Sequence, residues 1–442
     1  MKKWIPLIIA VLLVFGIGIA STLKGDKHES GGSQASGLFD RCTGDSDTTK
    51  LMDPHKIQAH IYVDNSGSMD GFVSTNSEFK DVIENLMVML NNKCSTPKAS
   101  LISDSIVDVD STQISSDVTK LARSLAPKRM KVGKTSSTDI NEMFQKVLDK
   151  TKENTVSILI TDGVYSIAGN DSRRLLTSAK NLTKNAFMQA IRRDSGDLSV
   201  LILQCQSDYN GTYYNMYDQP VPYVGKRPYY VIIAGKTDCM KSLDAAIDLT
   251  SSDIKGLMNT FRLSSKNTAG QMIFITAENL AYNTDRIVPL RGTWNIDNIR
   301  LTDTNQPFGL VLGIDKVDYY LDGSYLSDAS NYEISPSSVK IKNIGSVDRS
   351  SSAFGDVEEF KSPYFIQLDC KGMPSFVKVS LLYKVPEWGY RCSTEDDSQG
   401  VPPENVTFGI SYLLEGINEA VQDYNKINSN IFDFQIEIKN YD

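Results

Sequence analysis

The stretch IQAHIYVDNSGS, residues 57–68, joins an apolar run to a short polar loop. Because side chains alternate between the two faces of a strand, residues 57–63 predict a strand with one apolar face. Asp64 follows at the carboxyl end of this strand, and Ser66 and Ser68 come at alternate positions after it. In open α/β sheets, ligands bind at this end of the strands. One carboxylate and two hydroxyls are hard oxygen donors, which suit Mg²⁺ or Mn²⁺ better than a soft metal.

Two later segments contribute polar residues to the same predicted edge. Thr138 directly precedes a helical pattern that begins near Ile140, so its hydroxyl can cap the helix or bind a cation. Residues 155–161 form a second apolar strand, which ends in Asp162 and a glycine turn. Strands that alternate with helices up to about residue 240 predict a doubly wound, mostly parallel α/β sheet. We therefore expect oxygen donors from three segments to meet at one edge of that sheet.

The complete set of predicted metal ligands is Asp64, Ser66, Ser68, Thr138 and Asp162. This set closely resembles the metal-ion-dependent adhesion site of the von Willebrand factor type A domain, and the resemblance covers residues 55–240. It implies that the three hydroxyls contact the metal directly, whereas the two carboxylates hold it largely through water. It also implies that the ion, Mg²⁺ or else Mn²⁺ or Ca²⁺, accepts an exposed Asp or Glu side chain of a protein partner as a further ligand.

Composition divides the chain into five expected segments. They are a signal anchor or signal peptide at 1–24, a flexible linker at 25–54, the α/β domain at 55–240, a helical connector at 241–265 and a β-rich domain at 266–442. The last segment has short strand-like runs and one amphipathic helix near its end, and it resembles no family that we recognise.

The N-terminus predicts export. Lys2 and Lys3 precede an apolar run over residues 4–20, which is typical of a signal anchor or of a signal peptide cleaved near Ala20. The first case predicts a membrane-anchored protein with an extracytoplasmic body, and the second a secreted protein.

In an exported protein the six cysteines can pair. Proximity along the chain suggests Cys42–Cys94, Cys205–Cys239 and Cys370–Cys392, and buried free thiols are the alternative.

Charge and motifs exclude several functions. A net charge of −8 without a basic stripe argues against a nucleic-acid partner. No histidine follows residue 60, and neither a phosphate-binding loop nor a dinucleotide fingerprint is present, so we expect no enzyme. A metal-dependent phosphatase is the weakest alternative, because such an enzyme needs a second Asp where this chain has Ser66.

The candidate partner-binding residues are Asp70, Tyr213, Tyr214 and Tyr217. The three tyrosines belong to a Tyr-rich segment between two predicted strands, which is either a binding surface or a hairpin packed on its own domain. A rival hypothesis makes the chain a scaffold or assembly subunit of a cell-envelope complex. Its metal would then be constitutive and capped from within by Glu358 or Glu359.

Overall fold

The structure is a computed structural model that describes thirteen ranges of the chain. These are 51–109, 116–132, 139–167, 171–266, 271–278, 280–281, 289–290, 293–297, 300–301, 307–316, 323–346, 363–425 and 430–439.

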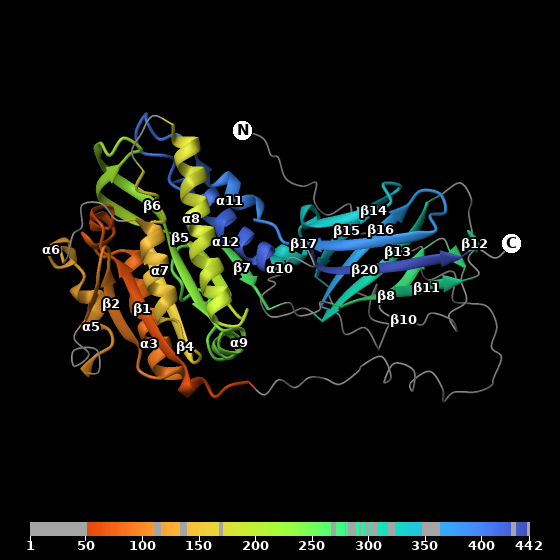
Figure 1. The fold of residues 1–442 in the computed structure, drawn as a ribbon, viewed down its shortest axis with the longest axis horizontal. Coiled ribbons are helices and arrows are strands. Elements are labelled where there is room, and N and C mark those ends of the chain that lie inside the picture. The colour runs from red at the N-terminus through yellow and green to blue at the C-terminus, as the bar shows by residue number, and fades with distance from the viewer. Residues whose placement is uncertain are drawn as a thin grey trace, which may run out of the picture. The chain divides into compact units, whose positions relative to one another are not determined.

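The largest sheet has seven strands in the order β3-β2-β1-β4-β6-β5-β7 (Figure 1). They are β1 (Gln58–Asp64), β2 (Lys98–Ile102), β3 (Ile106–Asp108), β4 (Thr155–Thr161), β5 (Ser199–Tyr214), β6 (Pro220–Gly235) and β7 (Leu257–Ser264). Strands β2, β1 and β4 are parallel, with Val63 of β1 opposite Leu101 and Ile160. All other pairings in this sheet are antiparallel. The expected parallel sheet is therefore limited to three central strands, and the sheet as a whole is mixed.

Helices cover both faces of this sheet. The helices of the described chain are α2 (Asp70–Val73), α3 (Glu78–Lys93), α5 (Lys120–Ser124), α6 (Pro127–Met130), α7 (Ile140–Lys150), α8 (Ser172–Arg193), α9 (Thr237–Ala246), α10 (Gly323–Leu326), α11 (Glu387–Arg391) and α12 (Ile410–Tyr424). Val63 belongs to a core with Phe79 of α3 and Leu243 of α9. Its neighbour Tyr62 belongs to the opposite core, with Phe187 of α8. The alternation of β1 thus contributes side chains to two separate cores, whereas the sequence pattern predicted a single apolar face.

The later strands form separate sheets. They are β8 (Gln271–Glu278), β9 (Leu280–Ala281), β10 (Pro289–Leu290), β11 (Thr293–Asp297), β12 (Arg300–Leu301), β13 (Phe308–Lys316), β14 (Tyr332–Ser335), β15 (Val339–Ser346), β16 (Tyr364–Cys370), β17 (Phe376–Leu382), β18 (Ser393–Thr394), β19 (Thr407–Phe408) and β20 (Asn430–Lys439). One sheet has the order β10-β11-β20-β17-β14 and another the order β15-β16-β13-β8. Most of these pairings are antiparallel. The β-rich character expected of this region is confirmed.

The C-terminal helix packs on the α/β part of the chain. Helix α12 runs beside α8 (Figure 1), and Lys180 of α8 forms ion pairs with Glu415 at 3.2 Å and Glu419 at 2.7 Å. A Cβ at Gly416 would lie 2.8 Å from the Lys180 carbonyl oxygen, so the two backbones approach closely. The expected assignment of this helix to a separate domain 266–442 is corrected, because an amphipathic pattern reveals an apolar face but not the surface it covers.

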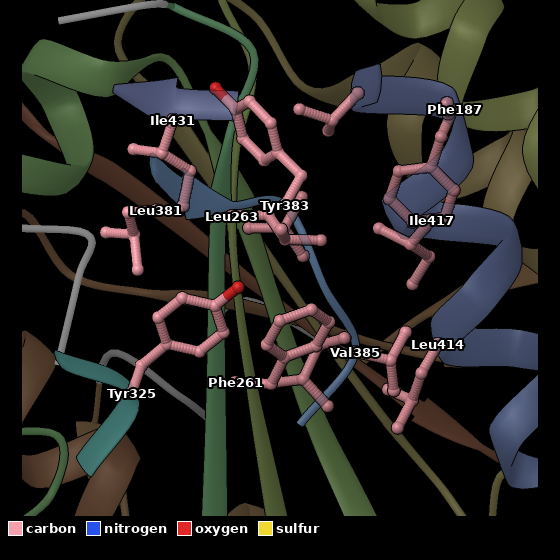
Figure 2. Close-up of a cluster of buried hydrophobic side chains, with 14 of the residues drawn as sticks. Phe187, Phe261, Leu263, Tyr325, Leu381, Tyr383, Val385, Leu414, Ile417 and Ile431 are labelled. Carbon is pink, nitrogen blue, oxygen red and sulfur yellow. The ribbon is translucent and has the colours of Figure 1, made fainter. Parts of the chain in front are cut away.

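The expected helical connector at 241–265 is only partly helical. Helix α9 ends at Ala246, and residues 257–264 form β7, the edge strand that pairs with β5. Its side chains Phe261 and Leu263 lie in one buried cluster with Leu414 of α12 and Leu381 of β17 (Figure 2). Residues 257–264 mix apolar and polar side chains over too short a length to fix a helical period, and pairing with β5 decides their structure.

The predicted disulfides are wrong for every cysteine that the structure describes. These five thiols are buried and free: Cys94, Cys205, Cys239, Cys370 and Cys392. Burial raises the pKa of Cys205 and of Cys239 to about 12, so both stay as unreactive thiols. Cysteines that are close in the sequence therefore do not form disulfide bonds in the described structure. The sixth cysteine, Cys42, lies outside the described residues.

The structure does not support the predicted membrane anchor. In the part of the chain that is described, no helix is both long and apolar enough to cross a membrane. The longest of these helices, α8, carries Lys180 and Lys184 in its middle. The apolar run at 4–20, on which the prediction rested, lies outside the described residues. Membrane anchoring, and the extracytoplasmic placement tied to it, are therefore not retained.

Candidate metal site

Two carboxylates lie at the ends of the adjacent parallel strands β1 and β4. Asp64 is 2 % exposed and Asp162 is 8 % exposed. The two oxygens of Asp64 are held separately: Oδ2 accepts a hydrogen bond from the Thr161 hydroxyl at 2.7 Å, and Oδ1 accepts one from the Ser66 amide at 2.8 Å. Parallel pairing of β1 with β4 thus brings together two acids that are nearly a hundred residues apart in the chain.

The two predicted serine ligands lie side by side in the loop after β1. Their hydroxyl oxygens are 3.1 Å apart, and both residues are half-buried. Ser68 also interacts with the Asp162 carboxylate and stabilises its charged form. Gly163, directly after Asp162, has a positive φ of 70°, and a Cβ there would lie 2.6 Å from the Tyr230 ring. Glycine is therefore required for the turn that positions Asp162.

Electrostatics make this pair of acids costly without a cation. Burial, and secondly the neighbouring Asp162 carboxylate, raise the pKa of Asp64 well above its usual range. Burial likewise raises the pKa of Asp162. Within the described residues, neither carboxylate forms an ion pair with a Lys or Arg side chain. Two buried carboxylates beside two hydroxyls are a donor set that a hard divalent ion fits, and such an ion would offset their repulsion.

The fifth predicted ligand, Thr138, lies outside the described residues. The chain before it is held next to the site. The side-chain amide of Asn65 donates hydrogen bonds to the backbone carbonyl oxygens of Met130 at 2.8 Å and Val132 at 2.7 Å. The chain after it begins α7, which Asp139 caps by accepting a hydrogen bond from the Asn141 amide. The described residues contain no cluster of three or more His, Cys, Asp or Glu that could hold a metal. The candidate set depends instead on hydroxyls.

The Tyr-rich segment is a hairpin that continues β5 and β6 beyond the rest of the sheet. The Tyr209 hydroxyl donates to the Ser68 carbonyl oxygen at 3.0 Å, so the hairpin contacts the loop that bears the candidate ligands. Tyr213 is buried, whereas Tyr214 and Tyr217 are 38 % and 43 % exposed. Of the three tyrosines predicted to contact a partner, two are accessible and Tyr213 has an internal role.

Asp70, the other predicted contact residue, is half-buried in the first turn of α2. Burial raises the pKa of its carboxyl group, and the positive charge of Lys131 partly opposes that shift. It lies near the serine loop in the sequence, but no contact among the described residues assigns it to the ligand set.

Sequence reasoning missed a segment from the C-terminal part of the chain, residues 397–407, which we call the strap. Several hydrogen bonds join it to strands β5 and β6 and to the turn between them. The Tyr213 hydroxyl hydrogen-bonds to Asp397, whose other oxygen accepts from the Met216 amide at 2.7 Å. The Tyr230 hydroxyl donates to Thr407 at 3.0 Å. No local pattern could reveal these contacts, because the partners are about 180 residues apart.

Arg227 of β6 was also missed. It is 3 % exposed, its guanidinium carbon lies 4.5 Å from the centroid of the Tyr213 ring, and Nη1 donates to the Val406 carbonyl oxygen at 3.5 Å. The one signal in the sequence was a charge placed two residues before the long apolar run 229–234.

Comparison with known proteins adds no relative. No family model matches the chain, and neither a curated protein nor a solved structure does. The candidate site therefore stands on its own residues and their geometry.

Proposed function

We propose that this chain is a binding protein of the von Willebrand factor type A kind. It would hold a divalent cation with Asp64, Ser66, Ser68, Thr138 and Asp162, and through that cation the Asp or Glu side chain of a protein partner. When bound, the ion supplies an electrophilic position for an oxygen ligand. The observation that carries the proposal is the pair of buried carboxylates beside two hydroxyls at adjacent strand ends.

The same geometry favours binding over catalysis. His60, which lies within β1, is held by the Ser100 hydroxyl at 2.7 Å and stacks on Tyr62. His55 lies before β1 in the short helix η1 (Pro54–Lys56), at the end of the strand opposite to Asp64. Neither is placed to act as a base beside the two serines. The phosphatase alternative still lacks its second Asp at position 66.

The scaffold hypothesis needs an acidic residue of this chain that caps the ion. Glu358 and Glu359, considered for that role, lie outside the described residues. Asp397 comes from the same part of the chain, but its carboxylate is engaged by Tyr213 and by the Met216 amide. We propose binding of an external carboxylate, since Asp397 is already engaged within the chain.

The test is a calorimetric titration of the full chain with Mg²⁺ and Mn²⁺, beside the variants S66A and D162A. We expect one site in the parent and a loss of about tenfold or more in affinity in each variant, since even outer-shell changes cost that much. Ser103→Ala is the matched control, because Ser103 is a buried serine directly after β2, outside the ligand set.

Thermal unfolding without metal gives a second readout. We expect D162A to unfold at a higher temperature than the parent, since one of the two repelling carboxylates is gone. A folded parent that binds neither ion would overturn the proposal.

A further inference from the structure

Arg227 lies on the face of the hairpin that contacts the candidate metal loop. Tyr230 of β6 pairs with Thr161, the last residue of β4. Because the two strands are antiparallel, the residues of β6 before Tyr230 extend beyond the end of β4. By this register Arg227 is two residues beyond the level of Asp162, roughly 7 Å along the strand. Arg227 pairs with Ser207 on β5, and side chains two residues apart share a face, so Arg227 and Tyr209 point to the same side. The Tyr209 hydroxyl contacts the Ser68 carbonyl oxygen on that side.

The charge of Arg227 is not cancelled by an ion pair. Its guanidinium contacts the Tyr213 ring and the Val406 carbonyl oxygen, and no carboxylate among the described residues lies within 4.0 Å of it. The positive charge nevertheless reaches Asp162, where it favours the ionised carboxylate. Asp397 lies beyond the Tyr213 ring and is satisfied by that tyrosine's hydroxyl and by a backbone amide. A guanidinium stays charged at any pH at which proteins fold, so this charge is permanent.

The inference rests on the proposed function and concerns its selectivity. Asp64 and Asp162 together balance one divalent ion, so Arg227 leaves the loaded site with an excess positive charge. We propose that Arg227 is a positioning residue that makes the loaded site select a carboxylate over a neutral oxygen ligand, and that it weakens cation binding in the free protein. Arg227 would therefore act through the field of a buried charge, which low-dielectric surroundings strengthen.

This role predicts effects of opposite sign, which a purely structural role does not. A positive charge repels a divalent ion and attracts an anion. Removal of the charge should therefore tighten cation binding and weaken carboxylate binding. A residue that only supports the hairpin would, when replaced, weaken both.

The experiment compares the full-length parent with R227Q and R227K. Mn²⁺ affinity is measured by calorimetry, and ligand binding by the loss of water-proton relaxation as acetate displaces water from bound Mn²⁺. Acetamide is the neutral probe of the same shape, and inorganic phosphate shows whether the preference extends to other oxyanions. We expect R227Q to bind Mn²⁺ about tenfold more tightly and acetate about tenfold more weakly, with acetamide unchanged. R227K should stay close to the parent in both.

Controls separate this inference from the proposed function. Lys226→Gln removes a neighbouring cation that is paired with Glu78 at 2.7 Å, and it should leave both affinities unchanged. R227M retains the apolar stem and serves as the neutral variant if R227Q fails to fold. In the parent alone, equal binding of acetate and acetamide would already overturn the inference. So would a fall of both affinities in R227Q, or no change in either, whereas a folded parent that binds no Mn²⁺ would overturn the proposed function itself.

Discussion

The two flanks of β4 are built in different ways. On one side, β1 and β2 are parallel to it, and the segment that links these two strands contains α3. On the other side, β6, β5 and β7 each pair with their neighbour in antiparallel fashion, and β5 and β6 continue into a long hairpin. The parallel flank takes its described strands and helices from one continuous stretch of chain before α8. The antiparallel flank is completed by α12 and by the strap, which come from far along the chain.

The contrast shows where each half obtains its stability. The parallel flank pairs strands that lie close together in the sequence, although its cores also include residues of α8 and α9. The antiparallel flank additionally depends on the strap, and α8 on α12, through contacts between segments about 180 to 240 residues apart. Contacts of such separation cost more loop-closure entropy and form later in folding. The candidate metal site lies on the boundary, since Asp64 belongs to the parallel flank and the hairpin above it to the other.

The largest effect is expected where α12 meets α8. In Gly416→Val, the new side chain would press on the Lys180 carbonyl oxygen and on Thr183, which a Cβ would approach to 2.8 and 2.9 Å. Because one of these is a backbone atom, we expect a loss of about 3 kcal/mol in the free energy of unfolding, measured with urea. Hydrogen exchange should rise in α8 and β5 and stay low in β1 and β2. Gly345→Val is the control, because among the described residues a Cβ at Gly345 meets only Phe365, at 3.9 Å. Equal loss of protection in both flanks would contradict the contrast.

A smaller effect is expected at the strap. Tyr213→Phe removes one of the two hydrogen bonds that satisfy the buried Asp397 carboxylate. A hydrogen bond to a charged group is worth about 1.5–3 kcal/mol, so we expect a loss of about 2 kcal/mol in unfolding free energy. The adjacent exposed tyrosine supplies the control, and Tyr214→Phe should change stability by less than about 0.5 kcal/mol. If both variants unfold at the same urea concentration as the parent, the strap is not a stabilising contact.

The smallest effect concerns the parallel flank alone. Burial in β1 lowers the pKa of His60 from 6.5 to about 4, an effect that the nearby Asp108 partly opposes. The unfolded chain therefore binds a proton between these two values while the folded chain does not, so stability present above pH 6.5 is lost as the pH falls toward 4. After allowance for solvent screening at this half-buried position, the loss between pH 7 and pH 5 should be about 1 kcal/mol.

Urea denaturation at the two pH values measures this loss. The variant His60→Gln should lose this part of the pH dependence. The control variant His55→Gln, at an exposed histidine, should retain the pH dependence of the parent. A parent and a His60→Gln variant with the same pH dependence would show that His60 is not responsible.

The parts of the fold that could be predicted from the sequence are those with local signals. Residues 57–63 and 155–161 alternate or run apolar and end in carboxylates, so β1, β4 and the positions of Asp64 and Asp162 followed directly. The helical periodicity of residues 410–424 likewise identified α12. These patterns do not show which part of the fold packs against each apolar face.

The remaining features depend on pairings that leave no trace in local sequence. The sequence suggests that Tyr213 is an exposed contact residue, whereas in the structure its hydroxyl hydrogen-bonds to the distant Asp397. The same holds for Cys205 and Cys239, whose spacing suggested a bond that the fold does not form. Arg227 looks like a surface charge at a strand end, and only the β5–β6 register and the strap make it a buried one.

The fastening of Arg227 to Val406 also has a consequence for biosynthesis. The two residues are 179 positions apart, so at about 5–20 residues per second the ribosome delivers the second roughly 10 to 40 s after the first. During that interval both candidate acids have already been synthesised, while the arginine is still without the carbonyl that later receives it. Vectorial synthesis would thus assemble this edge in a set order, with the cation ligands first and the permanent charge enclosed last.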